Sequence, residues 1–132
     1  MTKTDARRRS ETRPVRFPEP IELALGAAFA KKASAVTVLD LRQAAAFTDF
    51  FVICTGQNPR QVKAVADAVE EALRKAHVRP AHIEGYGRAE WVLIDCFDFV
   101  VHVFTPATRE FYALERLWGS ADRVDVSDRD GG

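Results

Sequence analysis

The fold is decided by the stretch WVLIDCFDFVVHVF, residues 91–104. It contains two strongly apolar runs rich in β-branched residues, 91–96 and 99–104, which are typical of buried strands. Only Phe97 and Asp98 separate the two runs. A connection of two residues allows only a tight antiparallel hairpin, so the sequence predicts two neighbouring antiparallel strands.

Three further segments complete the predicted sheet. Residues 35–41 (AVTVLDL) and 48–56 (TDFFVICTG) have the composition of strands, and residues 81–87 form a weaker, shorter candidate. The clearest helix begins at Asn58-Pro59, because Asn is a favourable N-cap and Pro fits the first turn. This helix separates the second and third strands, so those two strands can run parallel through a right-handed crossover.

Two more helices flank the strands in the chain. The first begins at Pro20, and the last begins at Thr105-Pro106. The apolar stripe expected for the last helix consists of Phe111, Leu114 and either Leu117 or Trp118. The sequence therefore predicts an α/β fold, a mixed sheet of about five strands flanked by helices.

The charge is unevenly distributed, although the formal net charge of the 132 residues is zero. Residues 1–16 have six basic side chains against two acidic ones, and residues 119–132 have two against four. We expect a disordered basic tail at 1–16, one domain at 17–118 and a disordered acidic tail at 119–132, because neither end has an apolar pattern. The domain itself has a net charge of −2, which disfavours a surface that coats nucleic acid.

The composition also indicates where the protein works. No run approaches the 18 apolar residues of a membrane span, and the N-terminal residues lack the apolar core of a secretory signal. Cys54 and Cys96 lie in apolar runs, as buried reduced thiols do. We therefore expect a cytoplasmic protein without a membrane partner.

The sequence offers few candidates for catalysis. His102 lies in an apolar strand and is expected to be structural, and the two cysteines lack the spacing of metal ligands or of a nucleophile motif. The turn at 55–63 (TGQNPRQVK) joins a strand to a helix, as many anion sites do. It lacks both glycine-rich phosphate-binding motifs, so we expect no catalytic residue and no cofactor.

The strand at 91–96 is more informative, because its two faces differ. Alternation places Trp91, Leu93 and Asp95 on one face and three apolar residues on the other, which must be core. A carboxylate is rarely buried unpaired, so the first face is expected to reach solvent, a helix end or a partner. Trp is enriched among interface anchors, although a lone Trp in a strand is more often part of a core.

Four blocks of the chain, in order, resemble the ribosomal silencing factor family, whose members are also called Iojap-related proteins. The blocks are TDFFVICTG…RQVKAVADAVEEAL, IEG, WVLIDCFDFVVHVF and REFYALERLW, within residues 20–118. The resemblance implies a small α/β domain with a nucleotidyltransferase-like outline but without the catalytic motifs. It also implies a translational repressor that binds large-subunit ribosomal protein fourteen and blocks association of the large and small subunits.

The same resemblance implies particular residues and partners. Trp91 becomes the best candidate contact with the ribosomal protein, and Glu84, Leu93 and Asp95 are weaker candidates from the same neighbourhood. Homodimers of the free protein are implied as well. The basic residues 1–16 could add a weak contact with ribosomal RNA. No enzymatic activity is expected.

The alternative is a nucleotide-binding enzyme related to nucleotidyltransferases. Such enzymes use a Gly-Ser turn followed by Asp-x-Asp, whereas this chain has Gly56-Gln57 after its strand and no Asp-x-Asp before its C-terminal tail. One departure from the resembled family is also visible, because the family usually has glycine where this chain has Phe97. If that position needs a positive φ, either Phe97 is strained or the turn type differs.

Overall fold

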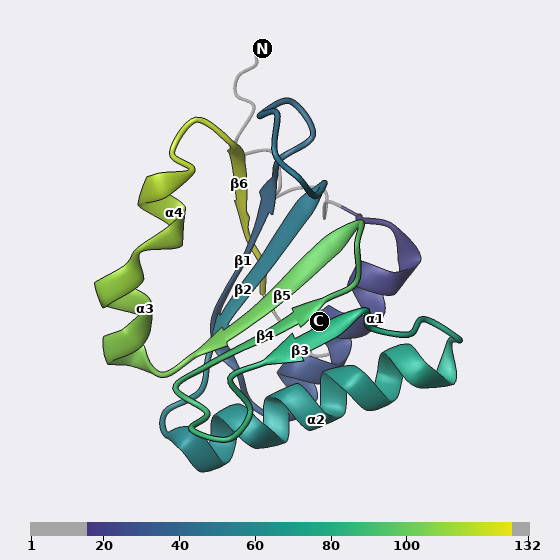
Figure 1. Cartoon of the computed structure of the whole chain (residues 1–132), viewed down its shortest axis with the longest axis vertical. Coiled ribbons are helices and arrows are strands. Elements are labelled where there is room, and N and C mark those ends of the chain that lie inside the picture. Colours follow the sequence, from purple (N-terminus) through teal and green to yellow (C-terminus); the bar gives the residue numbers. More distant parts are fainter. Residues whose placement is uncertain (1–15, 128–132) are drawn as a thin grey trace.

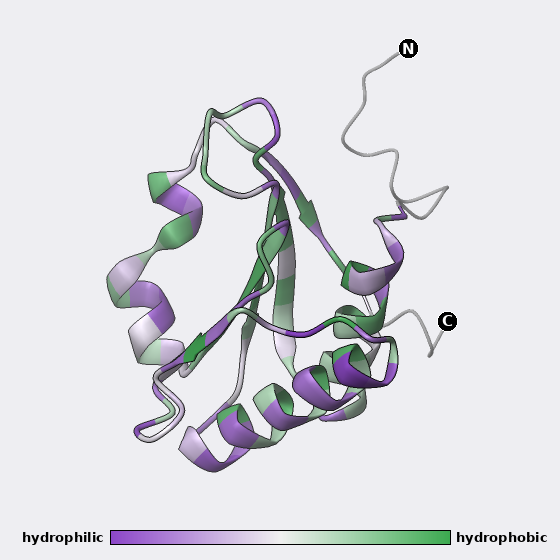
Figure 2. Ribbon diagram, turned by 45° about the vertical axis from the view of Figure 1, so that its right-hand side comes forward, coloured by the Kyte–Doolittle hydropathy of each residue, from purple (hydrophilic) through white to green (hydrophobic). Residues whose placement is uncertain are grey.

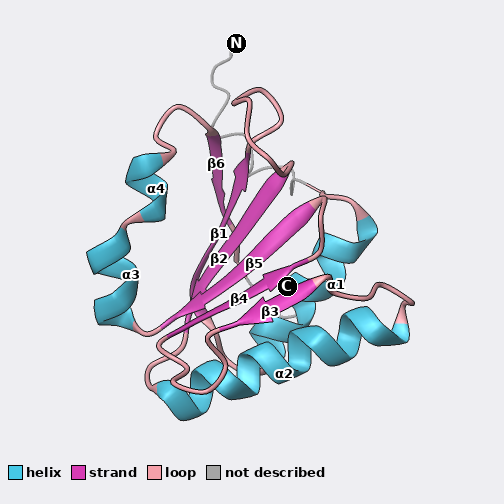
Figure 3. Cartoon of the chain, viewed as in Figure 1, coloured by secondary structure: helices cyan, strands magenta, loops and turns pink. Residues whose placement is uncertain are grey.

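The computed structural model describes residues 16–127 of the chain and consists of one sheet with helices on both faces (Figure 1). The six strands lie in the order β3-β4-β5-β2-β1-β6 (Figure 3). The elements in chain order are α1 (Glu19–Ala30), β1 (Ser34–Asp40), β2 (Phe50–Thr55), α2 (Pro59–Lys75), β3 (His82–Glu84), β4 (Trp91–Asp95), β5 (Phe99–Phe104), α3 (Pro106–Tyr112), α4 (Leu114–Leu117) and β6 (Asp122–Asp125).

The predicted hairpin is present as the second and third strands of this order. β4 and β5 are antiparallel, with Trp91 opposite Phe104 and Asp95 opposite Val100. β5 runs parallel to β2, and β2 runs antiparallel to β1. α2 carries the chain across the sheet to β3, which has the direction of β2 but lies beyond β5 and β4 at the edge. The predicted mixed α/β fold is confirmed.

The C-terminal segment differs from the prediction. Residues 122–125 form β6, an edge strand that pairs antiparallel with β1, so the domain does not end at residue 118. The sequence signal is weak because the strand is DRVD, with a single apolar residue, and much of its pairing comes from the backbone. Thr37 also donates a hydrogen bond of 3.0 Å to Asp125. The predicted tail at 1–16 lies almost entirely outside the described residues, as do residues 128–132.

The first face of the sheet is covered by α1 and α2 and holds the larger core. The Asn58 side chain caps α2 by accepting a hydrogen bond of 2.9 Å from the Gln61 backbone N–H, as its sequence position predicts. The buried stripe of α2 consists of Val62, Val65, Ala66, Val69 and Leu73. Figure 2 shows hydrophobic strands facing helices whose outer sides are hydrophilic. Burial of these stripes is the main stabilising contribution to the fold.

The second face holds a smaller core beneath α3 and α4. Ala113 adopts the left-handed conformation with φ of 48° and separates the two helices. Leu114 is therefore buried, whereas Phe111 and Leu117 are 79% and 73% exposed. The predicted apolar stripe is confirmed at Leu114 and at Trp118, which packs against this core, but it is wrong at Phe111, because the break at Ala113 changes which side chains face the sheet.

Phe97 occupies the hairpin turn with φ of 69°. Its backbone N–H donates a hydrogen bond of 2.9 Å to the Asp95 carboxylate, and the ladder between β4 and β5 keeps its register. The turn thus has a positive φ at this position without a glycine. The left-handed conformation costs roughly 1–2 kcal/mol for a residue with a Cβ atom. The backbone of Phe97 is therefore strained, but the register of the β4–β5 hairpin is intact.

Candidate protein-docking site

The four residues predicted to contact a partner lie on the second face, near the β3–β4 edge of the sheet. Glu84 is directly opposite Leu93 in the β3–β4 pair, so these two side chains lie next to one another. Trp91, Leu93 and Asp95 alternate with buried residues and are each partly exposed. The structure therefore brings all four onto one face, with Trp91 and Asp95 at opposite ends of β4.

Trp91 is held in a fixed orientation by its neighbours. Its indole Nε1 donates a hydrogen bond of 3.1 Å to Nδ1 of His102. The ring stacks on Phe104, with centroids 5.0 Å apart and planes inclined by 29°. Tyr112 of α3 packs against it at a centroid distance of 4.6 Å. Because the indole is already ordered, a partner that contacts it need not supply that ordering free energy.

His102 is structural, as its place in an apolar strand predicts, and it is 3% exposed. Because Trp91 donates to Nδ1, the neutral imidazole carries its proton on Nε2. Within residues 16–127, this Nε2 is buried without a hydrogen-bond partner. Burial lowers the pKa of His102 to about 4, so the ring is neutral at pH 7. His102 therefore acts as a fixed acceptor that orients Trp91.

A cavity of about 530 Å³ opens beside Trp91, between α3 and the connection from β3 to β4. We call it the Trp91 pocket. Its lining consists of Gly85, Arg88, Glu90, Trp91, Ala107, Thr108, Phe111 and Tyr112. Gly85 has φ of 83°, and a Cβ atom there would lie 2.0 Å from the Trp91 carbonyl oxygen, so this wall requires glycine. A concave site with aromatic walls and a few polar groups suits an apolar side chain of a partner.

The polar groups of the pocket lie at its rim. Arg88 and Glu90 form an ion pair of 3.5 Å, and their side chains are 84% and 51% exposed. An exposed pair of this kind contributes little to stability, so both groups can exchange partners at small cost. The rim therefore offers one positive and one negative charge beside an apolar interior.

Of the eight residues that line the pocket, the sequence identifies only Trp91 as a candidate contact, and the aromatic walls Phe111 and Tyr112 are missed. The sequence predicts that Phe111 belongs to a buried stripe and indicates no role for Tyr112. The structure exposes both, at 79% and 48%. The missing signal is the helix break, because an alanine at a left-handed φ has no sequence signature. From the sequence alone, it is clear only that Phe111 and Tyr112 follow the β4–β5 hairpin closely in the chain.

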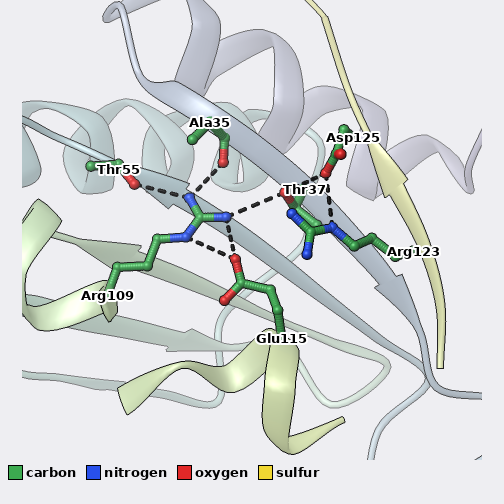
Figure 4. Close-up of polar contacts among 7 residues, drawn as sticks. All are labelled: Ala35, Thr37, Thr55, Arg109, Glu115, Arg123 and Asp125. Atoms are coloured by element: carbon green, nitrogen blue, oxygen red, sulfur yellow. Dashed lines mark hydrogen bonds and ion pairs between the residues drawn. The ribbon is translucent and has the colours of Figure 1, made fainter. Parts of the chain in front are cut away.

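α3 is anchored to the sheet by Arg109 rather than by buried apolar side chains (Figure 4). No residue of Pro106–Tyr112, all of which the structure describes, is buried. The Arg109 guanidinium donates to the Ala35 carbonyl, to Oγ1 of Thr55 at 2.9 Å and to Oγ1 of Thr37 at 3.3 Å. It also binds the Glu115 carboxylate through Nε and a terminal nitrogen. We call these five residues the Arg109 network.

The sheet is shaped to accept this side chain. The register between β1 and β2 shifts between Ser34 and Thr37, and Ala35 inside this bulge has φ of 49°. Figure 4 shows the Ala35 carbonyl turned toward the guanidinium. Burial alone would raise the pKa of Glu115, but hydrogen bonds from Arg109 lower it overall, so the ion pair is intact at neutral pH. The Arg109 network thus fixes the helix that carries one wall of the Trp91 pocket.

The turn at 55–63, the anion-site candidate from the sequence, uses several of its backbone donors internally. The Gln57 N–H donates to the Gln61 side chain at 2.7 Å, and the Gly56 N–H donates to the Phe104 carbonyl at 2.9 Å. The Gln61 N–H is taken by the Asn58 cap. These contacts make the turn a capped helix start rather than a cradle for phosphate.

The two cysteines and the side chains that can bind metal ions are the other candidates for chemistry. Cys54 and Cys96 are buried and reduced, and burial raises the pKa of the first to about 12 and of the second to about 11, so neither is a thiolate at neutral pH. Across residues 16–127, no three His, Cys, Asp or Glu side chains lie close enough together to hold a metal ion. No helix in that range is long and apolar enough to cross a bilayer.

The fold and the site together define a class of protein. It is a small α/β domain whose single mixed sheet carries an accessible, preorganised aromatic pocket at one edge, as domains that dock on other proteins do.

Comparison with known proteins identifies the family. The family described as "Ribosomal silencing factor during starvation" matches residues 14–131. Ribosomal silencing factor RsfS of Halalkalibacterium halodurans is 40% identical over 108 residues, which are 82% of this chain and 92% of that protein. The Bacillus subtilis protein of the same name is 35% identical over 106 residues, 80% of this chain and 90% of its own. A crystal structure of a Chromobacterium violaceum protein matches with a TM-score of 0.76 and 34% identity, over 87% of this chain and 97% of that one.

The chain belongs to the ribosomal silencing factor family. The resemblance noted in the sequence is thereby confirmed. Translation regulation by silencing of ribosomes is the role that the family description gives, and it is a regulatory role.

Proposed function

We propose that this chain is a translational repressor that binds large-subunit ribosomal protein fourteen and sterically blocks association of the two ribosomal subunits. Family membership supports the regulatory class. The observation that carries the proposal is the Trp91 pocket, because it is the accessible cavity that includes the residue first expected to contact the partner. No residue needs to perform chemistry for this function.

Binding would begin from the pocket. An apolar side chain of the ribosomal protein, inserted between Trp91, Phe111 and Tyr112, would bury apolar surface on both partners. Residues at the centre of an interface that exclude water in this way carry most of the binding free energy. Arg88 and Glu90 would pair with groups of the partner at the rim and so fix its orientation.

Glu84, Leu93 and Asp95 would extend the contact along β3 and β4. Leu93 is partly exposed between the other two on the same face, so it can add apolar area. The Glu84 carboxylate is 64% exposed and is close to His82, while Asp95 lies at the far end of the strand. Two carboxylates here suit a basic ribosomal protein and would favour fast association.

The size of the bound protein would keep the small subunit away from the large subunit. A domain of 112 residues, the number in the described range 16–127, has a radius of gyration of roughly 13 Å. A body of that size on the joining face would prevent close contact between the subunits. We further propose that the free protein forms homodimers, that it is cytoplasmic and that residues 1–16 add a weak contact with ribosomal RNA, which their positive charge supports.

Gradient sedimentation of purified subunits with and without the protein tests the mechanism. We expect the protein to migrate with the large subunit and the peak of joined ribosomes to decrease. Phe111→Ala should weaken affinity for the isolated ribosomal protein roughly tenfold, the loss of a typical anchor. Its melting temperature should not change, because Phe111 is 79% exposed. Leu117→Ala, at 73% exposure outside the pocket, is the matched control.

Two outcomes would contradict the proposal. Unchanged affinity of Phe111→Ala would remove the pocket from the interface, and normal subunit joining in the presence of bound protein would remove steric exclusion. Trp91→Ala is less informative alone. It also removes the hydrogen bond to His102 and the stacking on Phe104, so a lower melting temperature is expected with it.

A further inference from the structure

A second exposed apolar surface lies at the other end of β4, where the β4–β5 hairpin meets the β1–β2 connection (Figure 1). Phe47 and Phe97 are 76% and 73% exposed there. Thr48 Oγ1 donates a hydrogen bond of 2.7 Å to the Phe97 carbonyl, and the Asp49 N–H donates one of 3.0 Å to the Asp98 carbonyl. These bonds join the two connections into one surface. We call Phe47, Asp49, Phe97 and Asp98 the hairpin patch.

Phe97 is an unfavourable residue for the fold alone. Its φ of 69° is strained for a residue with a Cβ atom, and its ring is mostly in water. Glycine at this position would remove both costs. Backbone strain clusters at functional sites, so the strained Phe97 makes this turn a candidate binding surface.

The charged side chains around the Phe47 and Phe97 rings indicate which kind of partner this surface binds. Asp49 and Asp98 are exposed within the patch, and the partly exposed Asp95 lies beside them at the end of β4. Among residues 16–127, Arg42 lies close enough to Asp49 to interact with its charge, but its guanidinium already binds Asp40 at 2.7 Å. The surface is therefore net negative, which disfavours nucleic acid and anionic lipid and favours a basic protein segment.

Arg42 shows how a single arginine can bind a carboxylate and an aromatic ring at the same time. Its guanidinium binds the Asp40 carboxylate and also lies 5.0 Å from the centroid of the Phe50 ring. Arginine combines a flat cation that stacks on aromatic rings with donors that match a carboxylate. The hairpin patch presents two exposed phenyl rings, of Phe47 and Phe97, and two exposed carboxylates, of Asp49 and Asp98. We propose that the hairpin patch binds an arginine-bearing basic segment of a partner protein, separately from the Trp91 pocket.

A peptide titration tests the proposal on the full chain. The probe is a short, end-capped peptide of alternating arginine and glycine, and binding is followed by NMR shifts of the hairpin amides. Peptides with lysine or glutamate in place of arginine are the comparison. We expect the arginine peptide to bind more tightly than the lysine peptide and the glutamate peptide not to bind.

Variants locate the contact. Phe97→Gly should weaken binding of the arginine peptide roughly threefold, the effect of one exposed cation–π contact. It should remain folded, because glycine adopts the positive φ without strain. Leu117→Ala removes an apolar side chain of equal exposure, 73%, and should bind as the unchanged chain does. The probe contains no ribosomal component, so the result does not depend on the function proposed above.

Three results would overturn the proposal. The first is equal affinity of the arginine peptide for the unchanged chain and for Phe97→Gly. The second is binding that appears only after deletion of residues 1–16, which would make the chain's own basic segment the occupant. The third is a dimer that Phe97→Gly dissociates, which would make a second copy the occupant.

Discussion

Acid is expected to destabilise the protein through His102. This side chain is 3% exposed, and its Nδ1 accepts the hydrogen bond from Trp91. A second proton on the ring would place a charge in an apolar core and remove the acceptor. Burial is the cause that lowers the pKa of His102 to about 4. In the unfolded chain, the same imidazole has its ordinary pKa of about 6.5.

The size and sign of the effect follow from linkage. Between pH 6.5 and pH 4 the unfolded state binds the proton and the folded state does not, so stability falls as the pH is lowered through this range. The two pKa values differ by about 2.5, and each pKa step corresponds to about 1.36 kcal/mol. The full contribution is therefore about 3 kcal/mol, present above pH 6.5 and lost near pH 4. That is a large share of the 5–15 kcal/mol typical of a domain.

Urea unfolding at a series of pH values measures this loss, and His102→Gln isolates it. Glutamine does not titrate, and its side-chain oxygen can accept the bond from Trp91. The free energy of unfolding of the unchanged chain should fall more steeply than that of His102→Gln between pH 6.5 and 4. His82→Gln, which replaces an exposed histidine, is the matched control. Parallel curves for the unchanged chain and His102→Gln would refute the assignment.

Two further predictions concern stability. Arg109→Ala leaves Glu115 without its cation and should lower the free energy of unfolding by about 3 kcal/mol, with faster amide exchange across α3. Arg109→Lys should recover only part of this, because lysine lacks the planar fork; equal stability of both variants and the unchanged chain would show that the network does not hold α3. Phe97→Gly should raise the free energy of unfolding by about 1 kcal/mol in the same urea assay. A lower urea midpoint would show that the turn is not strained.

The central sheet could be predicted from the sequence because its signals are local. The two-residue gap at 97–98 allows only one connection, and alternation within 91–96 separates the core face from the second face. The strand β6 could not be predicted. Its residues are mostly charged, and its place beside β1 depends on backbone pairing with distant residues, such as Val124 with Val38, which are 86 positions apart in the chain. Such long-range pairing leaves no periodic pattern in the strand itself.

The candidate site was predictable only where it lies on the strand. Trp91, Leu93 and Asp95 follow from alternation, and Glu84 follows from the resemblance. Phe111 and Tyr112 depend on where α3 sits, which in turn depends on Arg109 reaching a bulge in β1. A partly buried guanidinium with acceptors from three other segments is a tertiary feature, and no sequence pattern predicts it.

The accessibility of the aromatic side chains explains why α3 is anchored to the sheet by Arg109. A helix that keeps its aromatic side chains accessible cannot use them to bind its own sheet, so its anchor must be a different side chain. Phe111 is two residues beyond Arg109, about 200° around the helix, so the anchor and the exposed ring point in nearly opposite directions. One guanidinium with several acceptors then fixes a helix that buries none of its residues. The local rule that an apolar helix residue faces the core fails at Phe111, at the wall of the Trp91 pocket, and failures of local rules are expected at functional sites.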